Sequence, residues 1–180
     1  MGEWRTHTTR TVYENAWITV REDDVTRPDG SDGIYGVTRV NQPAVFVVPV
    51  TDAGEVLLVR LYRYTIGQDS WEVPAGGSDG QDPLVAARRE LREETGRTAG
   101  SWTHLGHVYA LNGVADARAE VFLARELADE GGGSQEEEGI TDVRAVPWAE
   151  LMAMVRAGEI HDSETISCLM LAGLELGRIS

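Results

Sequence analysis

Three glutamates within five positions are the residues whose spacing in this sequence could support chemistry. Glu90, Glu93 and Glu94 follow a glycine-rich stretch. Asp82 can cap a helix at its start, and Gly96 can end it in a left-handed conformation, so we expect a helix of about three and a half turns. At about 100° per residue, the three carboxylates share one arc of this helix, beside and behind its apolar stripe.

The negative charge of this cluster needs compensation. Like charges four residues apart, as at Glu90 and Glu94, destabilise a helix by roughly a few tenths of a kcal/mol. Arg89 lies four residues before Glu93, so we expect an ion pair in which Arg89 orients Glu93. Hard divalent cations prefer carboxylate oxygens and can neutralise the remaining charge. A solvated surface helix laced with ion pairs is the plainer interpretation of such a run.

The segment in front of the helix favours a site over a plain surface helix. The sequence Pro-Ala-Gly-Gly at residues 74–77 follows a short apolar stretch and is a poor helix former. We therefore expect a sharp turn that brings bare backbone next to the helix. Backbone carbonyls of such a turn can complete a metal site.

The order of these residues resembles the signature of Nudix hydrolases, which cleave nucleoside diphosphates linked to another moiety. Gly76 is followed by a four-residue spacer, Gln81, seven further residues and then the run from Arg89 to Gly96, which matches at every fixed position. Three features depart from the family pattern. Gln81 replaces a glutamate that is usually structural, the spacer is one residue shorter, and Arg97 replaces an aliphatic residue.

The resemblance implies a divalent metal site and a base. Two or more Mg²⁺ ions, for which Mn²⁺ can substitute, would be held by Glu90, Glu93 and Glu94, with the Ala75 carbonyl as an extra ligand. Glu93 is also one candidate for the base. Arg89 belongs to the catalytic group as the residue that orients Glu93.

An acidic segment supplies the other candidates for the base. Residues 128–139 read ADEGGGSQEEEG, which predicts a mobile, solvated loop. In ADP-ribose pyrophosphatases, a branch of the Nudix family, a glutamate of the equivalent loop swings into the site as base or metal ligand. Glu137 and Glu138 are the candidates here, and the glycines of the loop can act as hinges.

Substrate-binding candidates lie on three segments. Arg63 stands between two tyrosines at the end of a predicted strand, where the resemblance implies an arginine that holds the substrate diphosphate. A solvated strand-end arginine is the alternative. Gly76 is assigned to the substrate site as well. In the loop at 113–118, relatives of the ADP-ribose branch often carry a distal-sugar glutamate where this chain has Ala117, and Asp116 is the candidate substitute.

Residues 1–40 predict a separate small sheet. Three segments rich in threonine, valine and aromatic residues read as strands, with a turn at residues 28–33. A sheet of this size is not stable alone, so it must pack on the main domain or on a second subunit. A similar sheet helps form a homodimer in the ADP-ribose branch, which implies a homodimer here. A hairpin that decorates a monomer is the alternative.

Residues 41–180 predict the main domain. Residues 43–50 and 54–64 are almost continuously apolar, which is typical of central strands. Two C-terminal helices are expected at residues 147–157 and 163–176, and the second has Ile166, Leu169, Met170 and Leu174 as its buried stripe. These helices would cover one side of a mixed sheet and the glutamate-rich helix the other. The fold class is therefore α/β (α+β): a Nudix-type α/β/α sandwich plus the N-terminal antiparallel sheet.

Composition narrows the classes of partner and compartment. The chain has 180 residues, 42% of them hydrophobic, and a formal net charge of -14, which disfavours binding to nucleic acids or anionic membranes. No apolar run is long enough to span a bilayer and no signal pattern opens the chain, so a cytoplasmic location is expected. A single cysteine, Cys168, and four histidines predict neither a disulfide nor a zinc cluster.

Three functions follow from the motif. The leading one is metal-dependent hydrolysis of ADP-ribose or a related nucleoside diphosphate sugar to a nucleoside monophosphate and a sugar phosphate. The second is hydrolysis of nucleoside triphosphates or dinucleoside polyphosphates. The third is a domain that senses a nucleotide sugar without cleaving it, which Gln81, the shortened spacer before it and Ala117 favour and the retained carboxylate cluster disfavours.

Overall fold

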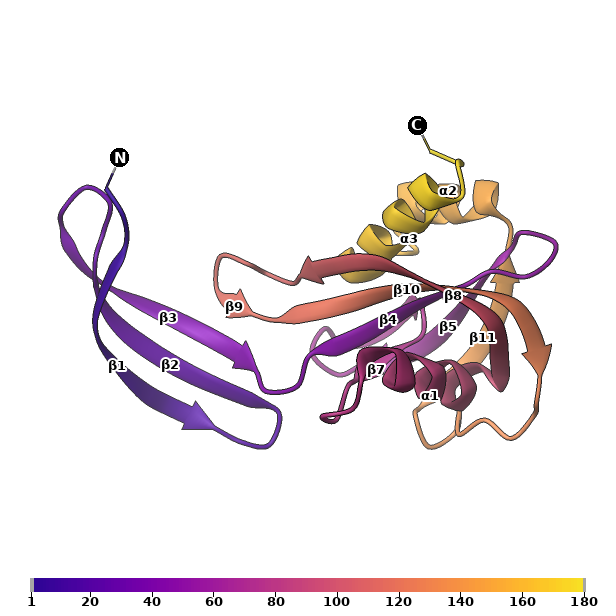
Figure 1. Cartoon of the computed structure of the whole chain (residues 1–180), viewed down its shortest axis with the longest axis horizontal. Helices are drawn as coiled ribbons and strands as arrows, with labels where there is room; N and C mark the ends of the chain where they lie inside the picture. Colours follow the sequence, from indigo (N-terminus) through magenta and orange to yellow (C-terminus); the bar gives the residue numbers. More distant parts are fainter. Residues whose placement is uncertain (1, 180) are drawn as a thin grey trace. The chain divides into compact units, whose positions relative to one another are not determined.

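A computed structural model describes residues 2–179 of the chain, which form two compact units (Figure 1). The first unit comprises residues 2–43 and Tyr109–Arg118. The second comprises Ala44–Val108 and residues 119–179. The first unit thus takes in a segment far along the sequence, beyond the N-terminal residues that the strand pattern predicts.

The first unit is one antiparallel sheet with a short added strand. Its order is β1 (Arg5–Glu14), β2 (Ile18–Thr26), β3 (Asp32–Val40) and β9 (Ala115–Asp116), and β9 runs parallel to β3. The three predicted N-terminal strands are present. Gly30 has a φ of 88° in the turn between β2 and β3, a conformation that glycine adopts without cost. Large apolar side chains of this unit are exposed, including Tyr13 of β1, Ile34 of β3 and Trp17 in the turn between β1 and β2.

The second unit contains two sheets. One has the order β7-β4-β10-β8 and the other the order β11-β5-β6. Their strands are β4 (Ala44–Pro49), β5 (Val56–Arg63), β6 (Gln68–Glu72), β7 (Ala75–Gly77), β8 (Arg97–Tyr109), β10 (Arg118–Asp129) and β11 (Ile140–Val146). β4 is parallel to β10 and antiparallel to β7, so the first of these sheets is mixed as predicted.

Helices cover both faces of the strand layer in the second unit (Figure 1). Because side chains alternate along a strand, Val45 and Val47 of β4 pack with α1 (Pro83–Thr95). Phe46 and Val48 point the other way and share a core with α2 (Trp148–Ala157) and α3 (Ser163–Glu175). The predicted α/β/α sandwich is confirmed. In the part of the chain from 2 to 179, the helices are too short or too polar to cross a membrane.

The ends of α1 are set by the residues predicted to cap it. The Asp82 carboxylate accepts hydrogen bonds from the backbone N–H groups of Leu84 and Val85, at 3.0 and 3.4 Å. Gly96 ends the helix in the left-handed conformation with a φ of 68°. The caps fix the length of α1, and the packing of Ala86, Ala87 and Leu91 on β4 sets its rotation and with it the direction of its glutamates.

Two details of the predicted elements are wrong. Residues 75–77 form the strand β7 paired with β4, and the turn lies later, where the Gln81 N–H donates to the Ser78 carbonyl. In α3, Met170 and Leu174 are exposed, while Thr165, Cys168, Leu169, Ala172 and Gly173 are buried. The helix is rotated because the Thr165 hydroxyl accepts a hydrogen bond from the Val73 N–H, and because small residues face the core.

Candidate functional site

Two of the three glutamates on α1 are buried against β7. Glu90 and Glu94 are 6% and 5% exposed. The Ala75 N–H donates a hydrogen bond of 3.0 Å to Glu94 Oε2. A Cβ on Gly76 would lie 2.3 Å from Glu90 Oε1, closer than any contact that such atoms make. Residue 76 must therefore be glycine for the Glu90 carboxylate to occupy this place.

Arg89 holds Glu90, and the predicted ion pair with Glu93 is wrong. Its Nη2 donates to Glu90 Oε1 at 2.8 Å and to the Gly77 carbonyl at 2.6 Å, and its Nη1 donates to Asp79 Oδ2 at 2.9 Å. Side chains on a helix lean toward its N-terminus, which carries the guanidinium back over the 77–79 segment and away from the following turn. Glu93 contributes only a weaker electrostatic interaction.

The two buried carboxylates lack full compensation for their charge. Burial raises the pKa of Glu90 to about 7, against the lowering effect of Arg89. Burial also raises the pKa of Glu94 to about 8, although the Ala75 N–H and Arg63 lower it. Glu138 raises both pKa values through space. A positive charge placed between these carboxylates would be strongly stabilised.

The donor chemistry of this cluster fits a hard divalent cation. Carboxylates of Glu90 and Glu94 interact electrostatically, and oxygen ligands are those that Mg²⁺ and Mn²⁺ prefer. Within residues 2–179, no three acidic, histidine or cysteine side chains already converge as a complete ligand set. Glu93 is only half-buried. The structure gives Ala75 a role through its N–H, and the Ala75 carbonyl ligand stays a prediction.

The acidic loop docks on the end of α1. The Ser134 N–H donates a hydrogen bond of 2.8 Å to the Glu93 carbonyl. This contact places Glu138 close enough to affect Glu90 and Glu94 electrostatically, although its side chain is exposed. Glu137 is exposed on the same turn. Glycines 131, 132 and 139 have φ values of 62°, 73° and 69°, so the loop has points at which the backbone direction changes freely.

Arg63 stands at the end of β5 and is held by a residue that the motif did not single out. Its Nε and Nη2 donate to Glu72 Oε1 and Oε2 at 2.9 and 2.5 Å. The hydrogen bonds that Arg63 donates to Glu72 raise the pKa of Arg63, which also interacts electrostatically with Glu94 and Asp162. Arg63 therefore joins the α1 carboxylates to a second acidic group. The only sequence signal for Glu72 was a charge within an apolar stretch.

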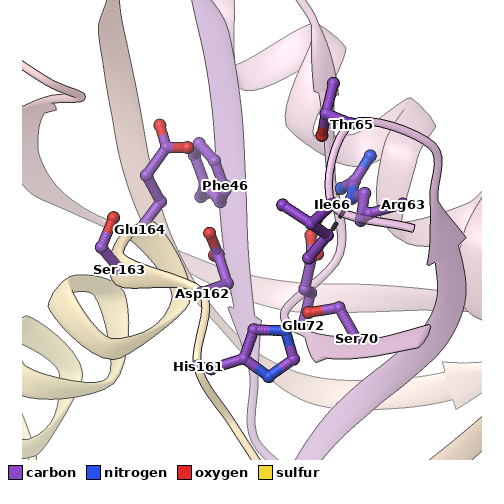
Figure 2. Close-up of a pocket in the computed structure, with 10 residues that line it drawn as sticks. All are labelled: Phe46, Arg63, Thr65, Ile66, Ser70, Glu72, His161, Asp162, Ser163 and Glu164. Carbon is purple, nitrogen blue, oxygen red and sulfur yellow. Dashed lines mark hydrogen bonds and ion pairs between the residues drawn. The ribbon is translucent and has the colours of Figure 1, made fainter. Parts of the chain in front are cut away.

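A pocket of about 460 Å³ lies beside Arg63 (Figure 2). It is lined by Ser70 and Glu72 on the strand side, and by residues 161–164 at the start of α3. Burial raises the pKa of Glu164, as do Asp162 and Glu72, whereas Arg63 lowers it. No sequence pattern marks these lining residues as functional, because a helix start with Asp and Glu is ordinary capping chemistry.

The remaining candidate lies in the first unit. Asp116 is part of β9, in register with Arg39 of β3, and its substrate role stays a prediction. The side chains of His104 and Cys168 have structural roles and lie outside the candidate site. His104 pairs with Glu120 at 2.7 Å, and Cys168 is buried with its thiol pKa raised by burial.

Comparison with known proteins decides the family. A sequence model of the NUDIX domain matches residues 40–167, which include α1, β7 and Arg63. The chain belongs to the Nudix hydrolase family. A second model, described as the nucleoside diphosphate sugar hydrolase N-terminal domain, matches residues 4–38. Nudix hydrolases generally use divalent metal ions, which agrees with the donor chemistry of the α1 carboxylates.

Named relatives of this Nudix hydrolase cover most of its length. The ADP-ribose pyrophosphatase of Mycobacterium tuberculosis is 35% identical over 169 residues, which is 92% of this chain and 81% of that protein. The ADP-ribose pyrophosphatase of Bacillus subtilis is 31% identical over 156 residues, 86% of this chain and 84% of that protein. A crystal structure of an ADP compounds hydrolase has the same fold, with a TM-score of 0.85, 23% identity and coverage of 99% and 98%.

Proposed function

We propose that this Nudix hydrolase cleaves the diphosphate bond of ADP-ribose or a related nucleoside diphosphate sugar. Water attacks one phosphorus, the bond to the bridging oxygen breaks, and a nucleoside monophosphate and a sugar phosphate leave. The observation that carries the proposal is the pair of buried, incompletely compensated carboxylates of Glu90 and Glu94, one turn apart, of which Glu94 interacts electrostatically with Arg63. The two ADP-ribose pyrophosphatase relatives support the choice of substrate.

The divalent cation would be held by the carboxylates of Glu90, Glu94 and Glu93 and by the Ala75 carbonyl, with Mg²⁺ as the proposed ion and Mn²⁺ as a substitute. Such an ion, when bound, neutralises phosphate charge and lowers the pKa of a water molecule. Arg89 and Gly76 keep the Glu90 carboxylate in place, one by a hydrogen bond and the other by leaving room for it. Both are positioning roles.

Arg63 and a glutamate complete the proposed chemistry. Arg63 is 43% exposed while its Glu72 partner is 6% exposed, so the guanidinium is oriented by Glu72 and can still meet a phosphate oxygen. The base that takes the proton of the attacking water is Glu93 or a glutamate of the acidic loop. Glu138 is favoured over Glu137 because Glu138 acts on both buried carboxylates.

The assembly belongs to the same proposal. We expect a homodimer that uses the exposed apolar side chains of the first unit, since Trp17 is 75% exposed and Tyr13 is 54% exposed. The match of residues 4–38 to the nucleoside diphosphate sugar hydrolase N-terminal domain supports a specialised role for this unit. A cytoplasmic location and the lack of nucleic-acid and membrane partners stay predictions.

Phosphate-coupled hydrolysis tests the function. ADP-ribose, GDP-mannose, UDP-glucose, ATP and a diadenosine polyphosphate would be compared with Mg²⁺, with Mn²⁺ and with chelator, using the wild type and Glu94→Gln. We expect metal-dependent cleavage of a diphosphate sugar and a loss of about 100-fold or more in the variant, because a charged ligand is removed. Preference for ATP would favour triphosphate hydrolysis. Binding without turnover would favour the sensing domain.

A further inference from the structure

The pocket beside Arg63 has two chemically different walls (Figure 2). Arg63, Ser70 and Glu72 come from β5 and β6. Asp162 and Glu164 come from the start of α3, where Asp162 is the cap of the helix. Asp162 and Glu164 together are called the α3 wall. The proposed hydrolysis uses Arg63 but gives no role to the α3 wall.

The charge of this pocket is unsuited to an anionic group. Among the residues that line it, Arg63 supplies the one guanidinium and Glu72, Asp162 and Glu164 supply three carboxylates. Arg63 is already paired through two hydrogen bonds with Glu72. The α3 wall therefore presents two acidic side chains without a cation of their own, and a phosphate deep in the pocket would be repelled.

Ser70 marks the pocket as a place for a ligand. This residue is 2% exposed, and its hydroxyl has no hydrogen-bond partner among residues 2–179. Figure 2 shows the hydroxyl directed toward Glu72 and the His161 ring, on the inside of the pocket. An unpaired buried hydroxyl is unfavourable, and a ligand that hydrogen-bonds to it removes that cost.

The Asp162 carboxylate of the α3 wall is held in an orientation in which it can accept hydrogen bonds from a ligand. Asp162 Oδ2 accepts a hydrogen bond of 2.7 Å from the Thr165 N–H, which fixes the orientation of the carboxylate. A carboxylate oxygen has room for further bonds, and a hydroxyl is the neutral donor that suits it. A group that offers several hydroxyls on one ring can donate to Asp162 and Glu164 while exchanging a hydrogen bond with Ser70.

We propose that this pocket binds an uncharged sugar ring of the substrate through Ser70, Asp162 and Glu164. The proposal rests on the proposed hydrolysis of a nucleoside diphosphate sugar. Arg63 interacts with Glu94 on one side and with Asp162 on the other, so the sugar would lie next to the diphosphate that Arg63 holds. Both the distal sugar and the ribose of the nucleoside have this chemistry.

Kinetics with ADP-ribose test the pocket. The variants are Ser70→Ala and Glu164→Ala, and the control is Glu175→Ala, which removes an exposed carboxylate from the same helix. We expect kcat/KM to fall about 3- to 10-fold for Ser70→Ala and about 10-fold or more for Glu164→Ala, as for neutral and charged hydrogen bonds. The control should stay within about twofold. Ser70→Ala should not lower the Tm, because the hydroxyl makes no bond in the free protein.

Product inhibition shows which sugar is bound. A higher inhibition constant for ribose 5-phosphate alone, in the Ser70 and Glu164 variants, assigns the pocket to the distal sugar. A higher constant for AMP alone assigns it to the nucleoside ribose. Unchanged kinetics and inhibition would overturn the proposal, and so would an equal loss for both products, which indicates general damage.

Failure of the proposed function is separable from failure of this inference. A wild type that cleaves no diphosphate compound would refute the hydrolysis. The same variants would then be titrated with ADP-ribose by calorimetry in the presence of Mg²⁺. Weaker binding by Ser70→Ala and Glu164→Ala, with Glu175→Ala unchanged, would still support a sugar pocket, whereas equal affinities would overturn it.

Discussion

At the scale of single residues, the position of the Glu90 carboxylate depends on two neighbours, a glycine without a side chain and an arginine that binds the carboxylate. The Glu90 carboxylate occupies the space that a side chain at residue 76 would fill, and Arg89 ties that carboxylate to the turn before the helix. The motif glycine and the motif arginine therefore act through Glu90. Neither needs to contact the substrate to be essential.

Gly76→Ala should impair catalysis by displacing the Glu90 carboxylate. The new Cβ would lie 2.3 Å from Glu90 Oε1 and 2.4 Å from Glu90 Cδ, so the end of this flexible side chain must move. We expect kcat/KM to fall about 10- to 100-fold, with a higher Mg²⁺ concentration for half-maximal activity, as for other changes that misplace metal ligands.

The neighbouring glycine provides the control for Gly76→Ala. A Cβ on Gly77 would meet Asp79 Oδ1 at 3.4 Å, an ordinary contact, so Gly77→Ala should have a much smaller effect in the same metal titration. Equal losses in the two variants would show that the strand β7, and not the Glu90 carboxylate, limits activity.

At the scale of elements, α1 and β7 together bury two carboxylates whose negative charges a cation would stabilise. The packing of Ala86, Ala87 and Leu91 in the core sets the rotation of α1, and β7 lies against Glu90 and Glu94. The helix thereby buries two carboxylates one turn apart, which disfavours their charged forms. A sharp turn in place of β7 would have left these groups in water.

The metal-free protein should lose stability as pH rises. The folded-state pKa values of Glu90 and Glu94 are raised to about 7 and 8 from 4.5, so the folded state holds protons that the unfolded state releases. Their contribution is favourable below about pH 4.5 and is lost as pH passes the raised values. We expect the Tm in chelator to fall by about 3 to 8 °C between about pH 5 and 9.

Two further melting curves assign this pH dependence to the α1 carboxylates. Added Mg²⁺ should restore the Tm at the alkaline end, because a cation stabilises the charged forms. Glu94→Gln should flatten the curve in chelator. A Tm that rises over this range in the metal-free wild type would contradict the assignment.

At the scale of the whole molecule, the chain carries two units with different surfaces. The first is a sheet that leaves large apolar side chains exposed, and the second has the sandwich, the α1 carboxylates and the pocket. A net charge of -14 opposes non-specific association, so a stable dimer needs a specific apolar surface. The first unit offers one.

Trp17→Glu should convert a homodimer into a monomer. Trp17 is 75% exposed, and a charge in a buried apolar interface is strongly unfavourable. Light scattering after size exclusion measures the mass directly. Leu174→Glu, which changes an exposed apolar residue of α3 in the second unit, should leave the mass unchanged. A monomeric wild type, or a dimer that survives Trp17→Glu, would refute the proposed assembly.

The sequence by itself determined the layout and the family. Periodic apolar residues, Asp82 and Gly96 specified α1, and the motif from Arg89 to Gly96 indicated a Nudix hydrolase. These features are local, because capping and helical spacing depend on neighbours within a few residues. The α/β/α order followed from the same patterns.

Only the tertiary structure decided which groups meet. Arg89 pairs with Glu90 in place of Glu93 because its guanidinium also donates to the Gly77 carbonyl of β7 and to Asp79 in the turn after it. Glu72 meets Arg63 across paired strands, and Asp162 and Glu164 reach the same pocket from a helix about 90 residues further along the chain. Such contacts depend on strand register and helix rotation, which no short stretch of sequence encodes.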